Sequence, residues 1–110
     1  MPFDVDLARR VREQLAGTSG VTEREMFGGK AFLVHGNMCV GVIREELVAR
    51  VGPERFPAAM ERAGTRPFAM TGRPMSGWVM VAPAGCPDDR ALAGWIADAM
   101  EYVTTLPRKG

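Results

Sequence analysis

The sequence is poor in the residues that most often carry chemistry, with two cysteines, one histidine and one tyrosine among 110 residues. Cys39 and Cys86 lie far apart in the chain, so their spacing predicts neither a disulfide framework nor a zinc site. His35 is closer to Cys39, but a predicted turn separates them, and a nucleophilic pair needs hydrogen-bond reach and a third orienting group. We therefore expect no metal, no cofactor and no catalytic residue, and we predict that the protein is not an enzyme.

A strong net charge and long apolar runs are lacking too. The formal net charge is +1 and the pI is about 7.8, far from the strongly basic balance of an electrostatic nucleic-acid binder. No apolar run approaches the roughly 20 residues of a membrane span, and the charges near the start exclude the apolar core of a signal peptide. Two thiols without a secretion signal are typical of a reducing compartment. We expect a cytoplasmic protein that binds no membrane and, by itself, no nucleic acid.

What is present is an ordinary globular composition, with 46% hydrophobic and 25% charged residues. A chain of 110 residues is near the commonest domain size and can bury one core without disulfides or metals. No linker, internal repeat or low-complexity segment divides the sequence. We predict that residues 1–110 form a single domain.

Hydrophobic periodicity and turn residues predict three helices and six strands in the order α-β-β-β-β-α-β-β-α. The helices are expected over residues 4–16, 53–63 and 87–103, and the strands over residues 21–26, 30–34, 38–43, 47–51, 67–70 and 77–82. Runs of consecutive strands favour an antiparallel sheet. We therefore predict a two-layer α+β fold with the helices on one face of the sheet.

The same patterns make predictions about single residues. A hairpin turn is expected at His35, Gly36 and Asn37, with Gly36 and Asn37 supplying positive φ. Trp95 belongs to the apolar stripe of the last helix, which predicts that it is buried against the sheet. Trp78 is expected to pack with Trp95 across the interface between the sheet and the helices.

The most informative segment is the run Glu25–Lys30, in which two glycines interrupt a strand-like stretch. One interpretation is a recognition bulge with an exposed phenylalanine between basic residues. The other is a structural kink that bends the sheet. On the first interpretation, the candidate interaction surface consists of Arg24, Met26, Phe27, Gly28, Gly29 and Lys30.

Motifs that extend from about Asp6 to Pro107 carry a resemblance to a known family. They are Met26-Phe27-Gly28-Gly29, Ala31-Phe32-Leu33-Val34, Gly36-Asn37-Met38, Val48-Ala49-Arg50-Val51-Gly52, Ala63-Gly64, Arg66-Pro67-Phe68, Thr71-Gly72-Arg73-Pro74-Met75, Gly77-Trp78-Val79, Trp95 and Leu106-Pro107. In their order and spacing they resemble the TfoX (Sxy) N-terminal domain family, in its short standalone branch. The resemblance implies a secretion-chaperone-like α+β fold, no established enzyme activity, and regulation of DNA uptake and transcription through protein contacts. It implies no catalytic residues.

Three functions are open on the sequence alone. The first, which we favour, is a non-enzymatic interaction or regulatory module that acts on other proteins or forms a homodimer. The second is a nucleic-acid-associated regulator, which would use a basic patch on the first helix formed by Arg9, Arg10 and Arg12, together with Arg24.

The third function is a small-ligand-binding domain with a pocket near Phe68, Trp78 and Trp95. A deep pocket with converging polar groups would favour this function. Charges clustered on one face would favour the second function, and a flat apolar patch would favour the first.

Overall fold

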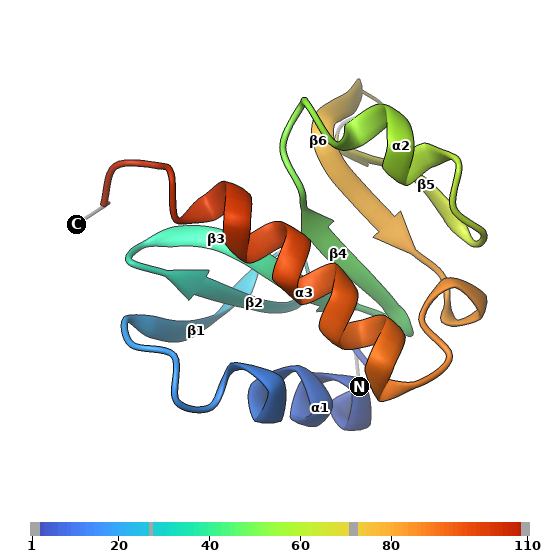
Figure 1. Ribbon diagram of the computed structural model, residues 1–110. Coiled ribbons are helices and arrows are strands. Elements are labelled where there is room, and N and C mark those ends of the chain that lie inside the picture. Colours follow the sequence, from blue (N-terminus) through green and yellow to red (C-terminus); the bar gives the residue numbers. More distant parts are fainter. Residues whose placement is uncertain (1–2, 27, 71–72, 109–110) are drawn as a thin grey trace.

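The computed structural model describes residues 3–26, 28–70 and 73–108 of the chain (Figure 1). Its helices are α1 (Val5–Leu15), α2 (Phe56–Met60) and α3 (Asp89–Val103), with a short 3₁₀ helix η1 (Pro83–Gly85). Its strands are β1 (Val21–Met26), β2 (Gly29–Val34), β3 (Asn37–Ile43), β4 (Glu46–Arg50), β5 (Thr65–Met70) and β6 (Arg73–Val81). The predicted α+β class and the predicted element order are confirmed.

All six strands belong to one antiparallel sheet with the order β1-β2-β3-β4-β6-β5. The first four strands follow one another as a meander, and β6 then inserts between β4 and β5. Strand β3 carries a bulge opposite the step from Phe32 to Leu33, where Cys39 is the extra residue. The edges of the sheet are β1 and β5.

Helices α1 and α3 cover one face of the sheet, and α2 lies beside β5 and β6 (Figure 1). Alternation along the strands sends every second side chain to this face, where it meets the apolar stripes of the helices. Trp95 is 0% exposed in this core, as predicted. The largest fully buried side chains around it are Phe32, Leu47, Leu92, Val11, Val34, Val40, Val42, Val51, Val79 and Val81.

The opposite face of the sheet carries a second, smaller apolar cluster. Its buried members are Ala31, Leu33, Met38, Val48, Phe68 and Met80. Trp78 is half-buried at this cluster, so the prediction that it packs with Trp95 is wrong. The reason is the alternation of β6, which sends Val79 and Val81 toward the helices and therefore Trp78 and Met80 away from them.

The β2–β3 hairpin differs from the prediction in which residues adopt positive φ. Val34 pairs with Asn37, and the two residues between them, His35 and Gly36, have φ of 51° and 84°. Two positive φ values in a two-residue loop match the right-handed twist of the strands. Asn37 is not a turn residue: it begins β3 and is buried.

The bounds around α2 and β6 also differ from the prediction. Helix α2 is much shorter than residues 53–63, because Pro57 sits in its first turn and Glu61 already leaves the helix. Strand β6 begins at Arg73, which pairs with Met70, so the strand starts four residues before the predicted start at Gly77. Of the predicted loop over residues 71–74, residues 71 and 72 lie outside the described part of the chain.

The helices are short relative to a bilayer. None in the described part of the chain is long and apolar enough to cross a membrane.

Candidate functional site

The predicted surface at residues 24–30 lies on a hairpin rather than on a bulged strand. Met26 of β1 pairs with Gly29 of β2, so the chain reverses between them. Gly28 has a φ of 74°, which suits such a reversal. The expected bulge or kink is therefore wrong, and Phe27 lies outside the described residues.

The described members of this surface do not share one face. Arg24 is exposed and has no ion pair among the described residues. Met26 packs against the second, smaller apolar cluster, on the face of the sheet opposite α1 and α3. Lys30 points to the helix-covered side, where its Nζ lies 3.9 Å from a Glu23 carboxylate oxygen. Gly29 is buried, and a side chain there would collide with the backbone of β3. The structure brings these residues together in space, but only Arg24 and Gly28 are exposed.

Strand β1 is an open edge of the sheet. The His35 amide donates to the Gly20 carbonyl at 2.9 Å, so every second residue from Gly20 bonds to β2. The intervening residues Val21, Glu23 and Glu25 therefore direct their N–H and C=O groups outward, and no described backbone group bonds to them. The other edge, β5, is blunted by Pro67.

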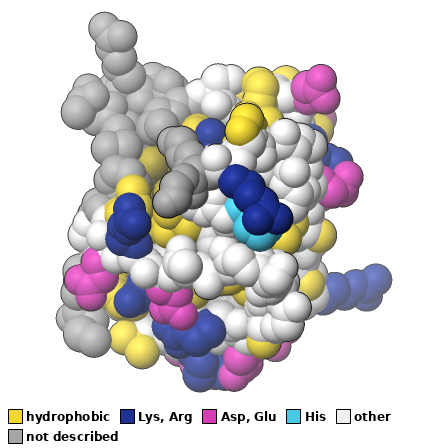
Figure 2. Space-filling model, turned by 90° about the vertical axis from the view of Figure 1, so that its left-hand side faces the viewer, with side chains coloured by type: hydrophobic (Ala, Val, Ile, Leu, Met, Phe, Trp, Pro, Cys, Tyr) yellow, Lys and Arg dark blue, Asp and Glu magenta, His cyan; other side chains and the backbone are white. Residues whose placement is uncertain are grey.

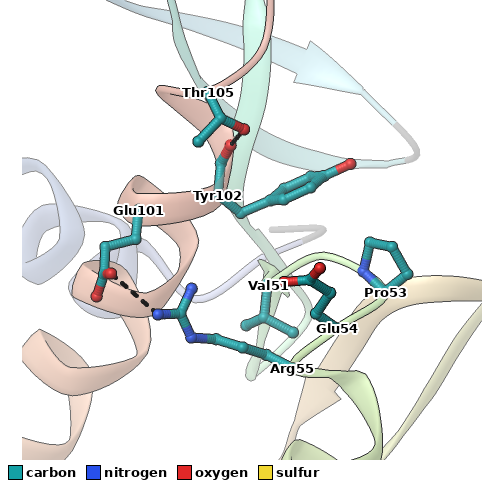
Figure 3. A pocket seen from close by; sticks show the side chains of 7 residues that line it. All are labelled: Val51, Pro53, Glu54, Arg55, Glu101, Tyr102 and Thr105. Carbon is teal, nitrogen blue, oxygen red and sulfur yellow. Dashed lines mark hydrogen bonds and ion pairs between the residues drawn. The ribbon is translucent and has the colours of Figure 1, made fainter.

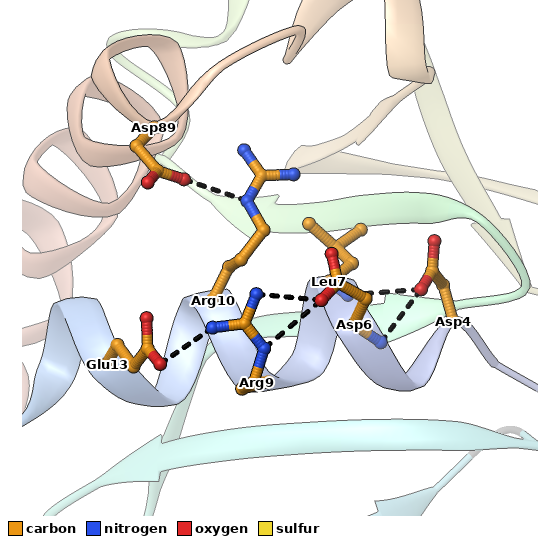
Figure 4. A network of polar contacts seen from close by, with 7 residues as sticks. All are labelled: Asp4, Asp6, Leu7, Arg9, Arg10, Glu13 and Asp89. Atoms are coloured by element: carbon orange, nitrogen blue, oxygen red, sulfur yellow. Dashed lines mark hydrogen bonds and ion pairs between the residues drawn. The ribbon is translucent and has the colours of Figure 1, made fainter.

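The arginines of α1 do not form an unpaired basic patch (Figure 4). Arg9 bonds both Asp6 and Glu13 at 2.7 Å on the same helix. Arg10 donates a hydrogen bond of 2.8 Å to Asp89 of α3, and Arg12 donates hydrogen bonds to both carboxylate oxygens of Glu23. The hydrogen bond from Arg12 holds the pKa of Glu23 below its ordinary value. Figure 2 likewise shows charges of both signs interspersed on the described surface in that view.

The pocket expected near Phe68, Trp78 and Trp95 is not formed by these three residues. The rings of Phe68 and Trp78 lie 6.1 Å apart on the helix-free side. Trp95 lies on the other side of the sheet, where its indole N–H donates to the Gly85 carbonyl at 3.1 Å. The guanidinium of Arg62 covers its ring at 3.7 Å from the ring centroid.

Sequence reasoning missed an arrangement around Arg50, at the end of β4. Its guanidinium carbon lies 4.8 Å from the ring centroid of Trp78, its cross-strand partner, and 5.6 Å from that of Tyr102 on α3. These residues line a cavity of about 280 Å³. The two segments Val48–Gly52 and Gly77–Val79 were recognised as motifs, but only their pairing in the sheet shows that they meet.

Neither thiol has the character of a nucleophile. Cys39 is 0% exposed, and burial raises its pKa to about 12. Burial also raises the pKa of Cys86. Within the described ranges, no group of three or more histidine, cysteine or acidic side chains is placed to hold a metal ion.

The sequence matches the model of one protein family. The model of the TfoX N-terminal domain matches residues 13–103, most of the chain. The chain belongs to the TfoX N-terminal domain family. The TfoX N-terminal domain family is associated with competence regulation and is of a regulatory type, not known as enzymatic. Comparisons with curated proteins and with solved structures returned no match.

Proposed function

We propose that residues 1–110 act as one non-enzymatic regulatory module that works by binding another protein in the cytoplasm. Membership in the TfoX N-terminal domain family supports a regulatory role, in competence or transcription. The observation that carries the proposal is the open edge of β1. It offers three residues whose backbone groups have no partner among the described residues.

The edge suits recognition by strand addition. An extended segment of a partner would bond to the outward backbone groups of Val21, Glu23 and Glu25 and continue the sheet. The candidate surface formed by Arg24, Met26, Phe27, Gly28, Gly29 and Lys30 lies at the end of the same strand and would contact the partner beside it.

The charges along β1 favour a partner that is a different protein. A two-fold symmetric pairing centred on Arg24 places Arg24 opposite its own copy and Glu23 opposite Glu25. Centring the pairing on either glutamate places that carboxylate opposite its own copy. Centring it on Thr22 avoids these pairs but places Glu25 opposite Ser19, outside the strand, so the ladder is shorter. Like charges directly opposite each other destabilise a strand pair. The homodimer expected from the sequence is the alternative.

The test removes one backbone N–H that points away from β2 and leaves the hydrogen bonds between β1 and β2 in place. Glu25→Pro deletes the outward N–H, whereas Glu25→Thr keeps it and removes the same charge. Both proteins and the wild type serve as baits for affinity purification from native cells, after circular dichroism has confirmed the fold. We expect a partner that the wild type and Glu25→Thr retain and that Glu25→Pro loses.

Equal retention of that partner by Glu25→Pro would show that the edge is not used. Light scattering with size exclusion at micromolar concentration tests the alternative. A wild-type dimer that Glu25→Pro converts to the 12.0 kDa monomer would make a second copy the occupant of the edge.

A further inference from the structure

Arg50 differs from the other cationic side chains of the protein. Among the described lysines and arginines, four are half-buried: Arg10, Lys30, Arg50 and Arg55. Arg10 pairs with Asp89, Lys30 with Glu23 and Arg55 with Glu101. Arg50 has neither an ion pair nor a hydrogen bond to any described residue. Because taking a cation partly out of water is costly without a partner, this state points to a ligand that supplies the missing acceptor.

Two aromatic rings hold the guanidinium in place. Trp78 and Tyr102 lie within the range of cation–π attraction, at 4.8 Å and 5.6 Å from ring centroid to guanidinium carbon. Rings satisfy the charge but not the directed donors of a guanidinium, which lie in its plane. The N–H groups of Arg50 are therefore positioned and still unpaired within the described structure.

Close backbone packing encloses the cavity beside Arg50. The amides of Val51 and Gly52 both donate to the Gly77 carbonyl, at 2.9 Å and 3.1 Å. Gly52 has a φ of 89°, and a side chain there would collide with the Tyr102 ring. Gly77 has a φ of 90° and lies against the backbone of Gly52. Two glycines thus let the end of β4, the middle of β6 and the Tyr102 ring approach closely enough to enclose the cavity.

A second cavity of about 530 Å³ adjoins the first, and Pro53 and Tyr102 line both (Figure 3). Its charged lining residues are one arginine and two glutamates: Arg55 bonds Glu101 at 3.0 Å, and Glu54 leaves one further negative charge. The adjoining surface therefore adds no net positive charge to the site. Among the described side chains of this region, a multiply charged anion would find one unpaired cation.

We propose that the Arg50 cavity binds a single carboxylate. A carboxylate matches the planar fork of a guanidinium with two parallel hydrogen bonds. Phosphate sites usually add several backbone N–H groups, but the amides of Val51 and Gly52 are already used by Gly77. The volume of about 280 Å³ fits a carboxylate on a short stem rather than a nucleotide. The carboxylate comes either from a free organic acid or from an acidic side chain of a protein. The site does not depend on the β1 edge.

The test is a titration of ¹⁵N-labelled protein followed by NMR at the Arg50 Nε–H, the Trp78 indole and the Gly77 amide. The probes are propionate, the capped peptide acetyl-Ala-Glu-Ala-amide, and inorganic phosphate. For so small a ligand we expect a Kd on the order of 1 mM for propionate. Arg50→Gln should weaken binding about tenfold or more, as loss of a charge-assisted bond predicts. Arg90→Gln, which removes the same charge from an exposed arginine, should change it less than about twofold.

Arg50→Lys is the second variant, because it keeps the charge and loses the planar fork; it should weaken binding about threefold or more. Thermal unfolding verifies that each variant folds. Binding of propionate alone assigns the site to free acids, and binding of both carboxylates at the same three signals assigns it to protein side chains. The proposal is overturned if propionate shifts none of these signals, if Arg50→Gln binds like Arg90→Gln, or if phosphate binds more tightly than propionate.

Discussion

The side-chain amide of Asn37 donates a hydrogen bond of 2.8 Å to the backbone carbonyl of Pro107. Asn37 is 5% exposed, and it is the one buried polar or charged residue among the described side chains. The bond ties the β2–β3 hairpin to the segment that follows α3. A buried amide is tolerated here because the carbonyl accepts its hydrogen bond.

Replacing Asn37 should therefore destabilise the fold. Asn37→Ala is expected to lower the free energy of unfolding by about 1–3 kcal/mol, because the Pro107 carbonyl loses its donor. Asn37→Asp should lower the free energy of unfolding further at neutral pH, since a carboxylate would face that carbonyl. This extra loss should shrink when acid protonates the carboxylate. Urea denaturation at pH 7 and pH 4 measures both. An Asn37→Asp protein as stable as the wild type at pH 7 would contradict this role.

Trp95 should be the most sensitive core position. Trp95→Ala is expected to cost about 3–5 kcal/mol, the usual loss when a large buried aromatic is removed. Trp95→Phe should cost less, because it keeps most of the buried area and loses the bond to the Gly85 carbonyl. Denaturant midpoints of the two variants give the comparison. Equal losses for both would mean that the hydrogen bond, and not the packing, dominates.

Glu46 should make stability depend on pH. Its side chain is 12% exposed and bonds to Arg66, which lowers its pKa below the ordinary value of 4.5. A lowered folded-state pKa means that the stabilisation is complete above pH 4.5 and is lost as the pH falls through the folded value. Because Arg66 is half-exposed, the contribution is about 1 kcal/mol or less.

The measurement compares the wild type with Glu46→Gln between pH 7 and pH 3. The stability difference should shrink toward the acid end of the range. Glu61→Gln, at an exposed glutamate with no ion pair among the described residues, is the matched control. A difference that stays constant over the range would exclude the Arg66 bond as its cause.

The thiols should react slowly in the folded protein. Burial raises the pKa of both, to about 12 for Cys39, so little thiolate forms at pH 8. Because the thiolate is the reactive species, we expect Cys39 to react about tenfold or more slower than an unfolded cysteine. A colorimetric thiol assay on native and denatured protein tests this, and two thiols should appear after denaturation. Rapid reaction of both in the native state would contradict their burial.

Binding to random duplex DNA should be weak. The net charge is +1, and the arginines of α1 are paired with carboxylates. We expect a Kd weaker than about 10⁻⁶ M at physiological salt. Fluorescence anisotropy over a range of salt concentrations measures it. A tighter complex with a steep salt dependence would favour the nucleic-acid alternative.

The sequence was sufficient to predict the fold class, the element order and the burial of Trp95, because these depend on periodicity within single elements. It was insufficient where the outcome depends on pairing between elements. Trp78 was assigned to the wrong face because alternation alone does not say which face of β6 the helices cover. Asn37 was assigned to the turn because asparagine tolerates positive φ, and its partner in the fold, Pro107, is remote in sequence.

The candidate site shows the same limit. The residues of the β1–β2 hairpin could be named from the sequence. That Arg24 and Lys30 lie on opposite faces of the sheet could not be predicted. The environment of Arg50 could not be predicted at all. It depends on the register that places Arg50 opposite Trp78 and on the docking of Tyr102 from the last helix.

The position of α3 after all six strands has a consequence for synthesis on the ribosome. All six strands precede Asp89 in sequence, and α3 supplies Trp95, Leu92 and Ile96 to the core. A chain made from its N-terminus therefore completes its sheet before it makes the helix that covers most of one face. Until then, strand residues such as Phe32 and Leu47 lack their largest packing partners. The nascent protein must protect that face, or delay its folding, until the last helix emerges.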